Sequence, residues 1–233
     1  MSAAGPPQGA NRAPLGGSAA REPDGPPGGR TREREARGSP SKPQAWGDQT
    51  TGLEDRARRV RMLSCDVDGV LTDGRIYVDD AGREFKAFCA LDGVAMHRLA
   101  NAGIVVAWIT GSKAPAVAHR AQQLRIPHLI VDAHDKLTPW QRLRGELGLV
   151  PEQCAHIGDD LPDIPLLRAC GLAATVPHAP SAVRAHAHYV TAREGGLGAV
   201  RELADLVLAA QGWGDVADAP GVGAGRATAS EAG

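Results

Sequence analysis

The sequence has little excess of either charge sign and no long apolar run. Its 26 Lys and Arg residues nearly balance its 27 Asp and Glu residues, which leaves a formal net charge of −1 at pH 7. This balance argues against a general electrostatic role on nucleic acid or on an anionic membrane. The longest strongly apolar run, 104–109, is far shorter than the ~20 residues that a membrane-spanning helix needs. We therefore expect neither nucleic acid nor a membrane as a partner.

Targeting and disulfide signals are also lacking. No apolar segment follows Met1, which predicts that the chain carries no secretory signal. The four cysteines, Cys65, Cys89, Cys154 and Cys170, show no C-x-x-C spacing. Cys65 and Cys154 lie within apolar, strand-like runs, where we expect small buried thiols. These features together predict a reducing, cytoplasmic compartment.

Large apolar residues are scarce at both ends of the chain. Those within 1–58 are Met1, Leu15, Trp46 and Leu53. Residues 214–233 are similarly poor in apolar side chains. Such segments bury too little apolar surface to offset the entropy of ordering the chain. We predict a disordered leader over 1–58, one folded domain over 59–213 and a disordered tail over 214–233.

Short apolar runs alternate with helical patterns through the predicted domain. The runs are 60–65, 104–109, 129–131, 154–157, 172–176 and 189–190. Between them, apolar residues recur at helical spacing, as in Val117, Ala121 and Leu124, and a last helical pattern covers 200–210. Strands that alternate with helices are typical of a parallel sheet. The sequence thus predicts a doubly wound, Rossmann-like α/β fold.

One segment interrupts this alternation. Two β-prone stretches, 75–78 and 84–88, flank the turn-forming residues 79–82, which predicts a β-hairpin inserted behind the first strand. Apolar residues such as Ile76 and Phe85 would be exposed on this ribbon, and a lone two-stranded hairpin is marginal in water. We expect the hairpin to be buried against other copies of the chain. The alternative is that it folds back onto its own domain.

Polar side chains follow four of the apolar runs. They are Asp66 and Asp68 after the first, Thr110 after the second, Lys136 beyond the third, and Asp159 and Asp160 after the fourth. Since ligands of open parallel sheets bind outside the carboxyl ends of the strands, we expect these side chains to converge. Clustered carboxylates repel one another unless a cation joins them, and an oxygen-only set suits Mg²⁺ better than zinc. Such a site is suited to a phosphoryl group, which a carboxylate can attack.

These motifs resemble those of the haloacid dehalogenase-type phosphohydrolases. The closer resemblance is to the 3-deoxy-D-manno-octulosonate 8-phosphate phosphatases, and it covers about 60–212. It rests on the four motifs and on strings such as Gly195-Gly196-Leu197-Gly198-Ala199-Val200-Arg201-Glu202 and Tyr189-Val190-Thr191. The resemblance implies a sheet of the haloacid dehalogenase type with no large cap domain. It also implies a homotetramer in which the hairpins meet and each subunit helps to close a neighbour's active site.

The same resemblance implies a role for each site residue. Asp66 would be the nucleophile that forms an aspartyl-phosphate, and Asp68 the general acid and base. Mg²⁺ would lie between the Asp66 carboxylate, the Asp68 backbone carbonyl and Asp159, with Asp160 in an outer position. The phosphoryl oxygens would be held by Thr110 and Lys136. The residues implied to contact the sugar acid or its phosphate are Asp92, Gly93, Arg120 and Lys136.

Some positions depart from the family pattern. Where Asn or Arg is common, the chain has Cys89, Leu91, His97 and Ser112. Losing cationic donors should weaken the grip on a carboxylate. The expected reaction is Mg²⁺-dependent hydrolysis of an octulosonate-like sugar-acid phosphate. The alternatives are a nonulosonate 9-phosphate or another small phosphate ester, a weakly active tetrameric accessory subunit of sugar-nucleotide synthesis, and a receiver-type phospho-acceptor domain.

Five further residues have more than one interpretation. Asp73 and Asp163 could support the site as carboxylates behind the ligands or could be plain turn and cap residues. His156 lies in a predicted strand, where we expect a hydrogen-bonded sheet residue rather than a ligand. The pair His186 and His188 has metal-like spacing, but it is far along the chain from the aspartates, so we predict surface residues.

Overall fold

The computed structural model describes residues 47–214, with side chains from residue 52. The helices are α1 (Gly47–Arg59), α2 (Ala90–Asn101), α3 (Pro115–Gln123), α4 (Leu137–Glu146), α5 (Ile164–Ala169), α6 (Ser181–Arg184) and α7 (Ala199–Ala210), with 3-10 turns η1 (Pro151–Gln153) and η2 (Leu161–Asp163). The strands are β1 (Met62–Cys65), β2 (Tyr77–Val78), β3 (Glu84–Phe85), β4 (Val105–Ile109), β5 (His128–Ile130), β6 (Cys154–Ile157), β7 (Leu172–Thr175) and β8 (Tyr189–Val190).

Six of these strands form one parallel sheet in the order β5-β4-β1-β6-β7-β8. Each of the six lies within or next to one of the apolar runs of the sequence. All residues of β1, β6 and β7 are buried, as expected for parallel strands that are covered on both faces. The predicted doubly wound α/β fold is confirmed.

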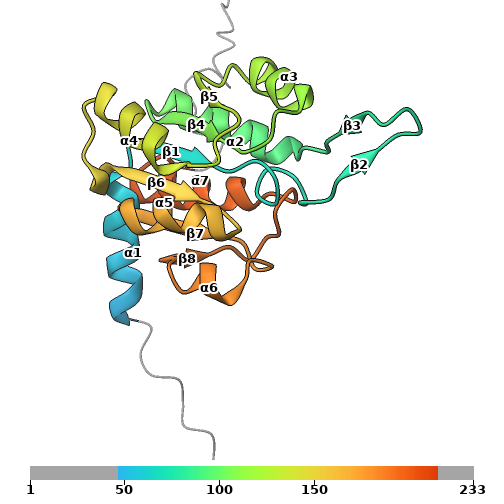
Figure 1. Cartoon of the computed structure of the whole chain (residues 1–233). Coiled ribbons are helices and arrows are strands. Elements are labelled where there is room, and N and C mark those ends of the chain that lie inside the picture. Colours follow the sequence, from blue (N-terminus) through green and yellow to red (C-terminus); the bar gives the residue numbers. More distant parts are fainter. Residues whose placement is uncertain (1–46, 215–233) are drawn as a thin grey trace, which may run out of the picture. The chain divides into compact units, whose positions relative to one another are not determined.

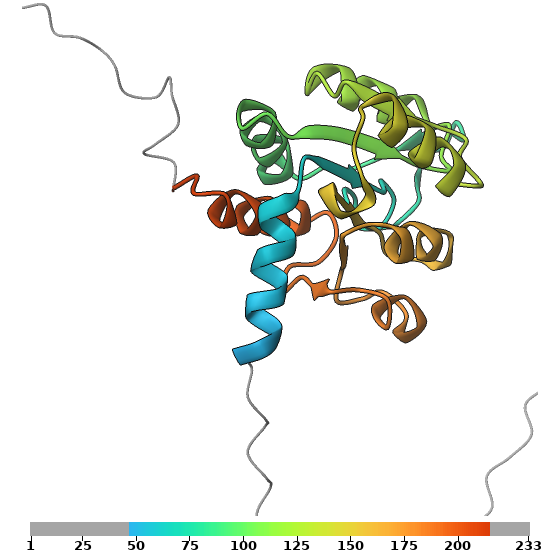
Figure 2. The same ribbon diagram turned by 90° about the vertical axis from the view of Figure 1, so that its left-hand side faces the viewer.

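Helices cover both faces of this sheet. On one face α2 packs against α7, which also contacts α1, whereas α4 and α5 pack together on the other (Figure 2). Large side chains such as Trp108 on β4 and Trp140 on α4 are almost fully buried between the layers. The carboxyl ends of the parallel strands meet at one edge of the sheet, and the loops that follow them build the site.

The first helix corrects the predicted domain boundary at residue 58. Helix α1 includes residues 47–58, which we expected to be disordered. Ala57 is fully buried, Leu53 packs against the core, and Arg56 Nη1 donates to the Gly171 carbonyl at 2.6 Å. The composition of residues 47–58 did not reveal this helix, because it contributes few apolar residues and is stabilised by its tertiary contacts. Residues 1–46 and 215–233 lie outside the described residues.

The predicted hairpin is present as the antiparallel pair β2 and β3, shorter than expected, with Tyr77 opposite Phe85. The rings of these two residues stack with centroids 5.2 Å apart. Figure 1 shows the hairpin projecting away from the layers rather than folding back onto them. Ile76 is 77% exposed and Phe85 53% exposed. Within the described residues, no larger insertion stands over the sheet.

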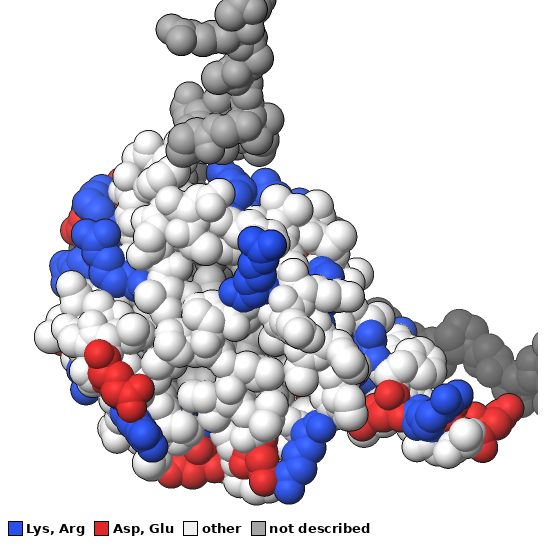
Figure 3. Space-filling model, turned by 90° about the horizontal axis from the view of Figure 1, so that it is seen from above, with Lys and Arg blue, Asp and Glu red and all other residues white. Residues whose placement is uncertain are grey.

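Charges of both signs are mixed on the surface. Figure 3 shows Lys and Arg next to Asp and Glu on the projecting hairpin, and in this view neither sign dominates a face. Among residues 47–214, no helix is both long and apolar enough to cross a membrane.

Candidate active site

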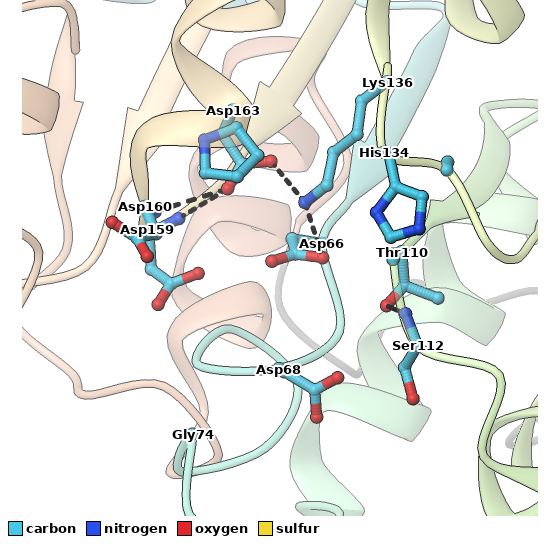
Figure 4. A pocket seen from close by; sticks show the side chains of 13 residues that line it. Asp66, Asp68, Gly74, Thr110, Ser112, His134, Lys136, Asp159, Asp160 and Asp163 are labelled. Atoms are coloured by element: carbon cyan, nitrogen blue, oxygen red, sulfur yellow. Dashed lines mark hydrogen bonds and ion pairs between the residues drawn. The ribbon is translucent and has the colours of Figure 1, made fainter.

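A pocket of about 380 Å³ lies at the carboxyl edge of the sheet (Figure 4). All six residues that we predicted for catalysis and metal binding line it, namely Asp66, Asp68, Thr110, Lys136, Asp159 and Asp160. The sequence reasoning did not single out His134, which also lines the pocket. The topology explains the convergence, because β1 lies between β4 and β6 and the loops after these strands are therefore neighbours.

Two glycines allow the loops to approach closely. At Gly69 φ is +89°, and an added Cβ would lie 2.0 Å from Asp159 Oδ2. At Gly158 an added Cβ would lie 2.3 Å from Asp163 Cγ. A side chain at either position would displace a carboxylate of the site.

Lys136 connects the carboxylates across the pocket. Its Nζ lies 2.8 Å from Asp66 Oδ1 and 2.8 Å from Asp163 Oδ1, and its side chain is 5% exposed. Burial alone would lower the pKa of Lys136, but the charges of Asp66 and Asp163 outweigh burial and raise it. The ammonium therefore stays charged and fixes the Asp66 carboxylate.

Asp163 supports the site from behind the pocket. Of its two interpretations, a supporting carboxylate or a plain cap residue, the structure favours the first. Its side chain is fully buried, and its Oδ2 accepts the backbone N–H groups of Asp159 at 3.2 Å and Asp160 at 3.3 Å. Burial would raise the pKa of Asp163, but hydrogen bonds and charges from His156 and Lys136 hold it at about 2. Asp163 is thus an ionised carboxylate that fixes both Lys136 and the loop after β6. Asp73, in contrast, accepts the Tyr77 hydroxyl at 2.6 Å and anchors the hairpin.

The arrangement of carboxylates fits a hard divalent cation. One oxygen each from Asp66, Asp159 and Asp163 lie within 4.8 Å of one another. Burial, with the charge of Asp163, raises the pKa of Asp66 to about 7 and that of Asp159 to about 6. Among the described residues, the buried Asp159 Oδ1 has no hydrogen-bond partner. An oxygen-only set of repelling carboxylates with a free buried oxygen suits Mg²⁺.

The other two predicted metal residues stand apart from this triad. Asp160 is exposed and its Oδ1 accepts the Leu161 N–H at 2.8 Å, so it caps the turn η2. The Asp68 carboxylate pairs instead with Lys86 Nζ at 2.6 Å. Only the backbone carbonyl of Asp68 was predicted as a ligand, so the position of its side chain away from the triad does not conflict with that prediction.

Lys86 is a site neighbour that the sequence reasoning missed. It follows β3 in the hairpin, its side chain is 4% exposed, and its Nζ also contacts Glu84 Oε1 at 2.7 Å. The hairpin segment therefore contacts the edge of the pocket in the same chain through Lys86. A signal in the sequence could have found it, because only a short segment joins the Asp68 loop to the hairpin and so keeps the hairpin residues near the site.

Thr110 presents its hydroxyl to the pocket from the end of β4. Its backbone is fixed on both sides, because its N–H donates to Ile130 and its carbonyl accepts from Ala133. The Thr110 Oγ1 accepts the Ser112 N–H at 3.0 Å. The hydroxyl proton is then available to a ligand oxygen.

Three residues implied to bind substrate do not line this pocket. Asp92 is 2% exposed, and its Oδ1 accepts the Arg201 N–H at 2.8 Å, in the first turn of α7. Gly93 and Arg120 are close to each other, since a Cβ at Gly93 would lie 3.0 Å from Arg120 Nη2. Of the four positions that depart from the family pattern, only Ser112 lines the pocket, whereas Cys89, Leu91 and His97 do not.

Comparison with known families agrees with the geometry. Residues 126–201 match the family model of haloacid dehalogenase-like hydrolases. The parallel six-stranded sheet, the Asp that follows β1 and the Lys136–Asp163 pair at the same edge agree with the motifs by which the sequence resembles this class. The chain is a phosphatase of the haloacid dehalogenase type, and the receiver-type alternative is wrong.

Comparison with individual relatives shows which family of these phosphatases the chain belongs to. The 3-deoxy-D-manno-octulosonate 8-phosphate phosphatase of Yersinia pestis is 44% identical over 166 residues, which are 71% of this chain and 89% of the relative. The enzyme of the same name from Escherichia coli K12 is 41% identical over 72% of this chain and 89% of its own length. The crystal structure of the Moraxella catarrhalis enzyme, in complex with magnesium, phosphate and a KDO molecule, superposes with a TM-score of 0.67 at 41% identity, covering 69% of this chain and 92% of that one. The chain belongs to the family of 3-deoxy-D-manno-octulosonate 8-phosphate phosphatases.

Proposed function

We propose that this phosphatase hydrolyses 3-deoxy-D-manno-octulosonate 8-phosphate through an aspartyl-phosphate on Asp66, with Mg²⁺ as cofactor. The observation that carries this proposal is the buried Asp66 carboxylate, held 2.8 Å from Lys136 Nζ at the bottom of the pocket. The names of the relatives support the substrate, and the magnesium ion in the Moraxella structure supports the cofactor.

The first step is an attack on phosphorus by a carboxylate oxygen of Asp66. As the new P–O bond forms, the bond to the sugar oxygen breaks, and Asp68 gives its proton to that oxygen. Lys136 and the Thr110 hydroxyl bind the phosphoryl oxygens, whose charge they offset. Mg²⁺, held by Asp66 and Asp159, would supply further charge stabilisation of the phosphoryl group.

The second step releases phosphate. Asp68, now ionised, takes a proton from a water molecule that attacks the phosphorus of the aspartyl-phosphate. The bond between phosphorus and Asp66 breaks, inorganic phosphate leaves, and both carboxyl groups return to their starting states. The side chain of Asp68 is 36% exposed, which leaves it accessible to water as well as to substrate.

The pocket also suits the alternative substrates. Ser112 lines it where the family pattern commonly has arginine, and its Oγ accepts the Ala114 N–H at 3.2 Å. A hydroxyl binds a carboxylate less tightly than a guanidinium does. This favours testing a nonulosonate 9-phosphate and smaller esters beside the octulosonate. A weakly active accessory subunit would turn over none of them efficiently.

The test is a panel of phosphate esters with added Mg²⁺. We expect the highest kcat/KM for 3-deoxy-D-manno-octulosonate 8-phosphate, and a nonulosonate 9-phosphate and p-nitrophenyl phosphate serve as comparisons. The Asp66→Asn protein is the control for contaminating phosphatase. A higher kcat/KM for the nine-carbon ester would reject the substrate while leaving the reaction class intact. Negligible turnover of every ester would favour the accessory-subunit alternative.

The exposed apolar side chains of the hairpin support association of several copies through their hairpins, and the family resemblance supports a homotetramer as the form of that assembly. Ile76, Val78 and Phe85 are each more than half exposed on this projecting ribbon. Replacing Ile76 and Phe85 with Asp should yield smaller species by light scattering, with lower turnover. Val150→Asp, at a half-exposed position outside the hairpin, is the matched control and should leave the mass unchanged. A fully active wild-type monomer would refute the assembly.

The state of the cysteines supports a cytoplasmic location. All four are free, and Cys65, Cys154 and Cys170 are buried. Burial raises the pKa of the Cys65 thiol well above its ordinary value, so this thiol stays protonated. Free thiols of this kind fit a cytoplasmic enzyme.

A further inference from the structure

A buried polar group lies directly behind the pocket and has no part in the reaction described above. His156 on β6 is fully buried and does not line the pocket. Its neighbours Cys154, Ala155 and Ile157 are apolar and also fully buried. An apolar residue could fill the same position without the cost of desolvating an imidazole, so the strand itself does not require a histidine.

Both ring nitrogens of His156 have a partner. Nδ1 lies 3.0 Å from the hydroxyl of Ser64, the residue paired with His156 in the β1–β6 register. Nε2 lies 3.2 Å from Asp163 Oδ1. Because an ionised carboxylate only accepts hydrogen bonds, Nε2 is the donor to Asp163.

Asp163 transmits this contact to the pocket. The oxygen that accepts from His156, Oδ1, also accepts from Lys136 Nζ at 2.8 Å. The other oxygen holds the backbone N–H groups of Asp159 and Asp160. If the carboxylate rotated, it would lose the lysine that fixes Asp66 and would release the loop that carries Asp159.

We propose that His156 is a positioning residue of this phosphatase, which fixes the Asp163 carboxylate and through it Lys136 and the Asp159 loop. The inference rests on the proposed reaction at Asp66. The hydrogen-bonded side chains of Ser64, His156 and Asp163 connect the middle of the sheet to the pocket, and all three are fully buried. Outer partners of this kind typically change metal affinity or activity by about 10- to 100-fold when they are removed.

Two substitutions separate the two ring contacts of His156. In His156→Gln the side-chain amide reaches the position of Nε2 and can still donate to Asp163. In His156→Asn the amide reaches only the position of Nδ1 and keeps the contact with Ser64. Cys154→Ala, two residues earlier on the same buried strand, is the matched control, because it perturbs packing without touching Asp163.

The experiment uses the full chain and two readouts. The first is kcat and KM on p-nitrophenyl phosphate, and the second is Mg²⁺ affinity measured by calorimetry without substrate. We expect His156→Asn to lower kcat or Mg²⁺ affinity by about tenfold. We expect His156→Gln to lose less of both values than His156→Asn, because only its contact with Ser64 is gone. We expect Cys154→Ala to change only the melting temperature. Neither readout depends on which sugar phosphate is the natural substrate. An error in the proposed substrate would therefore appear in the panel of phosphate esters and not in these measurements.

Equal kcat and equal Mg²⁺ affinity in the Asn and Gln proteins would overturn the proposal, and so would a loss in Cys154→Ala as large as that in His156→Asn. If neither histidine variant folds, Ser64→Ala provides the same test with a smaller change. It removes the contact that orients the ring, and we expect a lower kcat with unchanged KM. An unchanged kcat in Ser64→Ala would then reject the role.

Discussion

Asp92 is expected to set stability rather than substrate binding, and its titration can be measured. Its Oδ1 accepts the Arg201 N–H, one of the unpaired donors at the start of α7. The other oxygen, Oδ2, is buried and has no partner among the described residues. Burial raises the pKa of Asp92 from its ordinary 3.8 to about 6, against the opposing hydrogen bonds from α7.

The sign and size follow from linkage. Because the pKa of Asp92 is higher in the folded than in the unfolded protein, the folded state holds its proton more tightly. The resulting contribution to the free energy of unfolding is fully present below pH 3.8, and it is lost as pH rises through about 6. At about 1.36 kcal/mol per pKa unit, the loss amounts to about 3 kcal/mol. Asp92→Asn carries no charge at either pH. Its free energy of unfolding should therefore rise relative to wild type by about 3 kcal/mol between pH 3.8 and pH 7.5.

The assay is urea unfolding at the two pH values, followed by the fluorescence of the buried Trp108 and Trp140. Asp80→Asn, which alters an exposed carboxyl in the hairpin turn, is the control and should show no such divergence. We also expect Asp92→Asn to keep the wild-type KM. A constant difference between Asp92→Asn and wild type at both pH values would refute the burial argument. A large rise in KM would restore the substrate-binding role that the family resemblance implied.

Four further predictions test other parts of the account. EDTA should abolish hydrolysis of p-nitrophenyl phosphate and added Mg²⁺ should restore it, whereas undiminished activity in EDTA would exclude the metal. Asp68→Asn should lower kcat by ~10²–10⁴-fold, and a near-normal kcat would mean that another group moves the proton. Gly69→Ala, whose Cβ would lie 2.0 Å from Asp159 Oδ2, should weaken Mg²⁺ binding in calorimetry, and unchanged affinity would contradict the close approach. Ala57→Glu buries a charge under α1 and should lower the free energy of unfolding by several kcal/mol, about 3 or more; an unchanged melting temperature would show that α1 does not dock.

Local pattern was enough to predict the sheet and the residues at its edge. Strands buried on both faces leave continuous apolar runs, and the residue after each run lies at the carboxyl edge whatever the helices between them do. For this reason the amino-acid sequence alone places Asp66, Thr110 and Asp159 in one pocket. The hairpin was predictable for a similar reason, since turn-forming residues between two β-prone stretches are a local signal.

Contacts between distant segments could not be predicted in the same way. Helix α1 has too few apolar residues to stand out, and Asp163 looks like any cap residue until Lys136 is found beside it. Asp92 carries a family motif, yet its burial against α7 depends on the packing of two helices that are about a hundred residues apart. The need for a glycine at a close approach of two segments is equally hard to predict. An added Cβ at Gly171 would lie 2.5 Å from the Glu152 carbonyl oxygen.

Covalent catalysis at Asp66 is the central claim, and trapping the intermediate tests it most directly. The full chain with Mg²⁺ and substrate is quenched in acid within one turnover, and the peptides are sequenced by mass spectrometry. We predict a phosphoryl group on Asp66 that appears and decays at rates that match turnover, and none in Asp66→Asn. Phosphate released at the full rate with no phosphorylated Asp66 at any time, or with the phosphoryl group on another residue, would contradict the account.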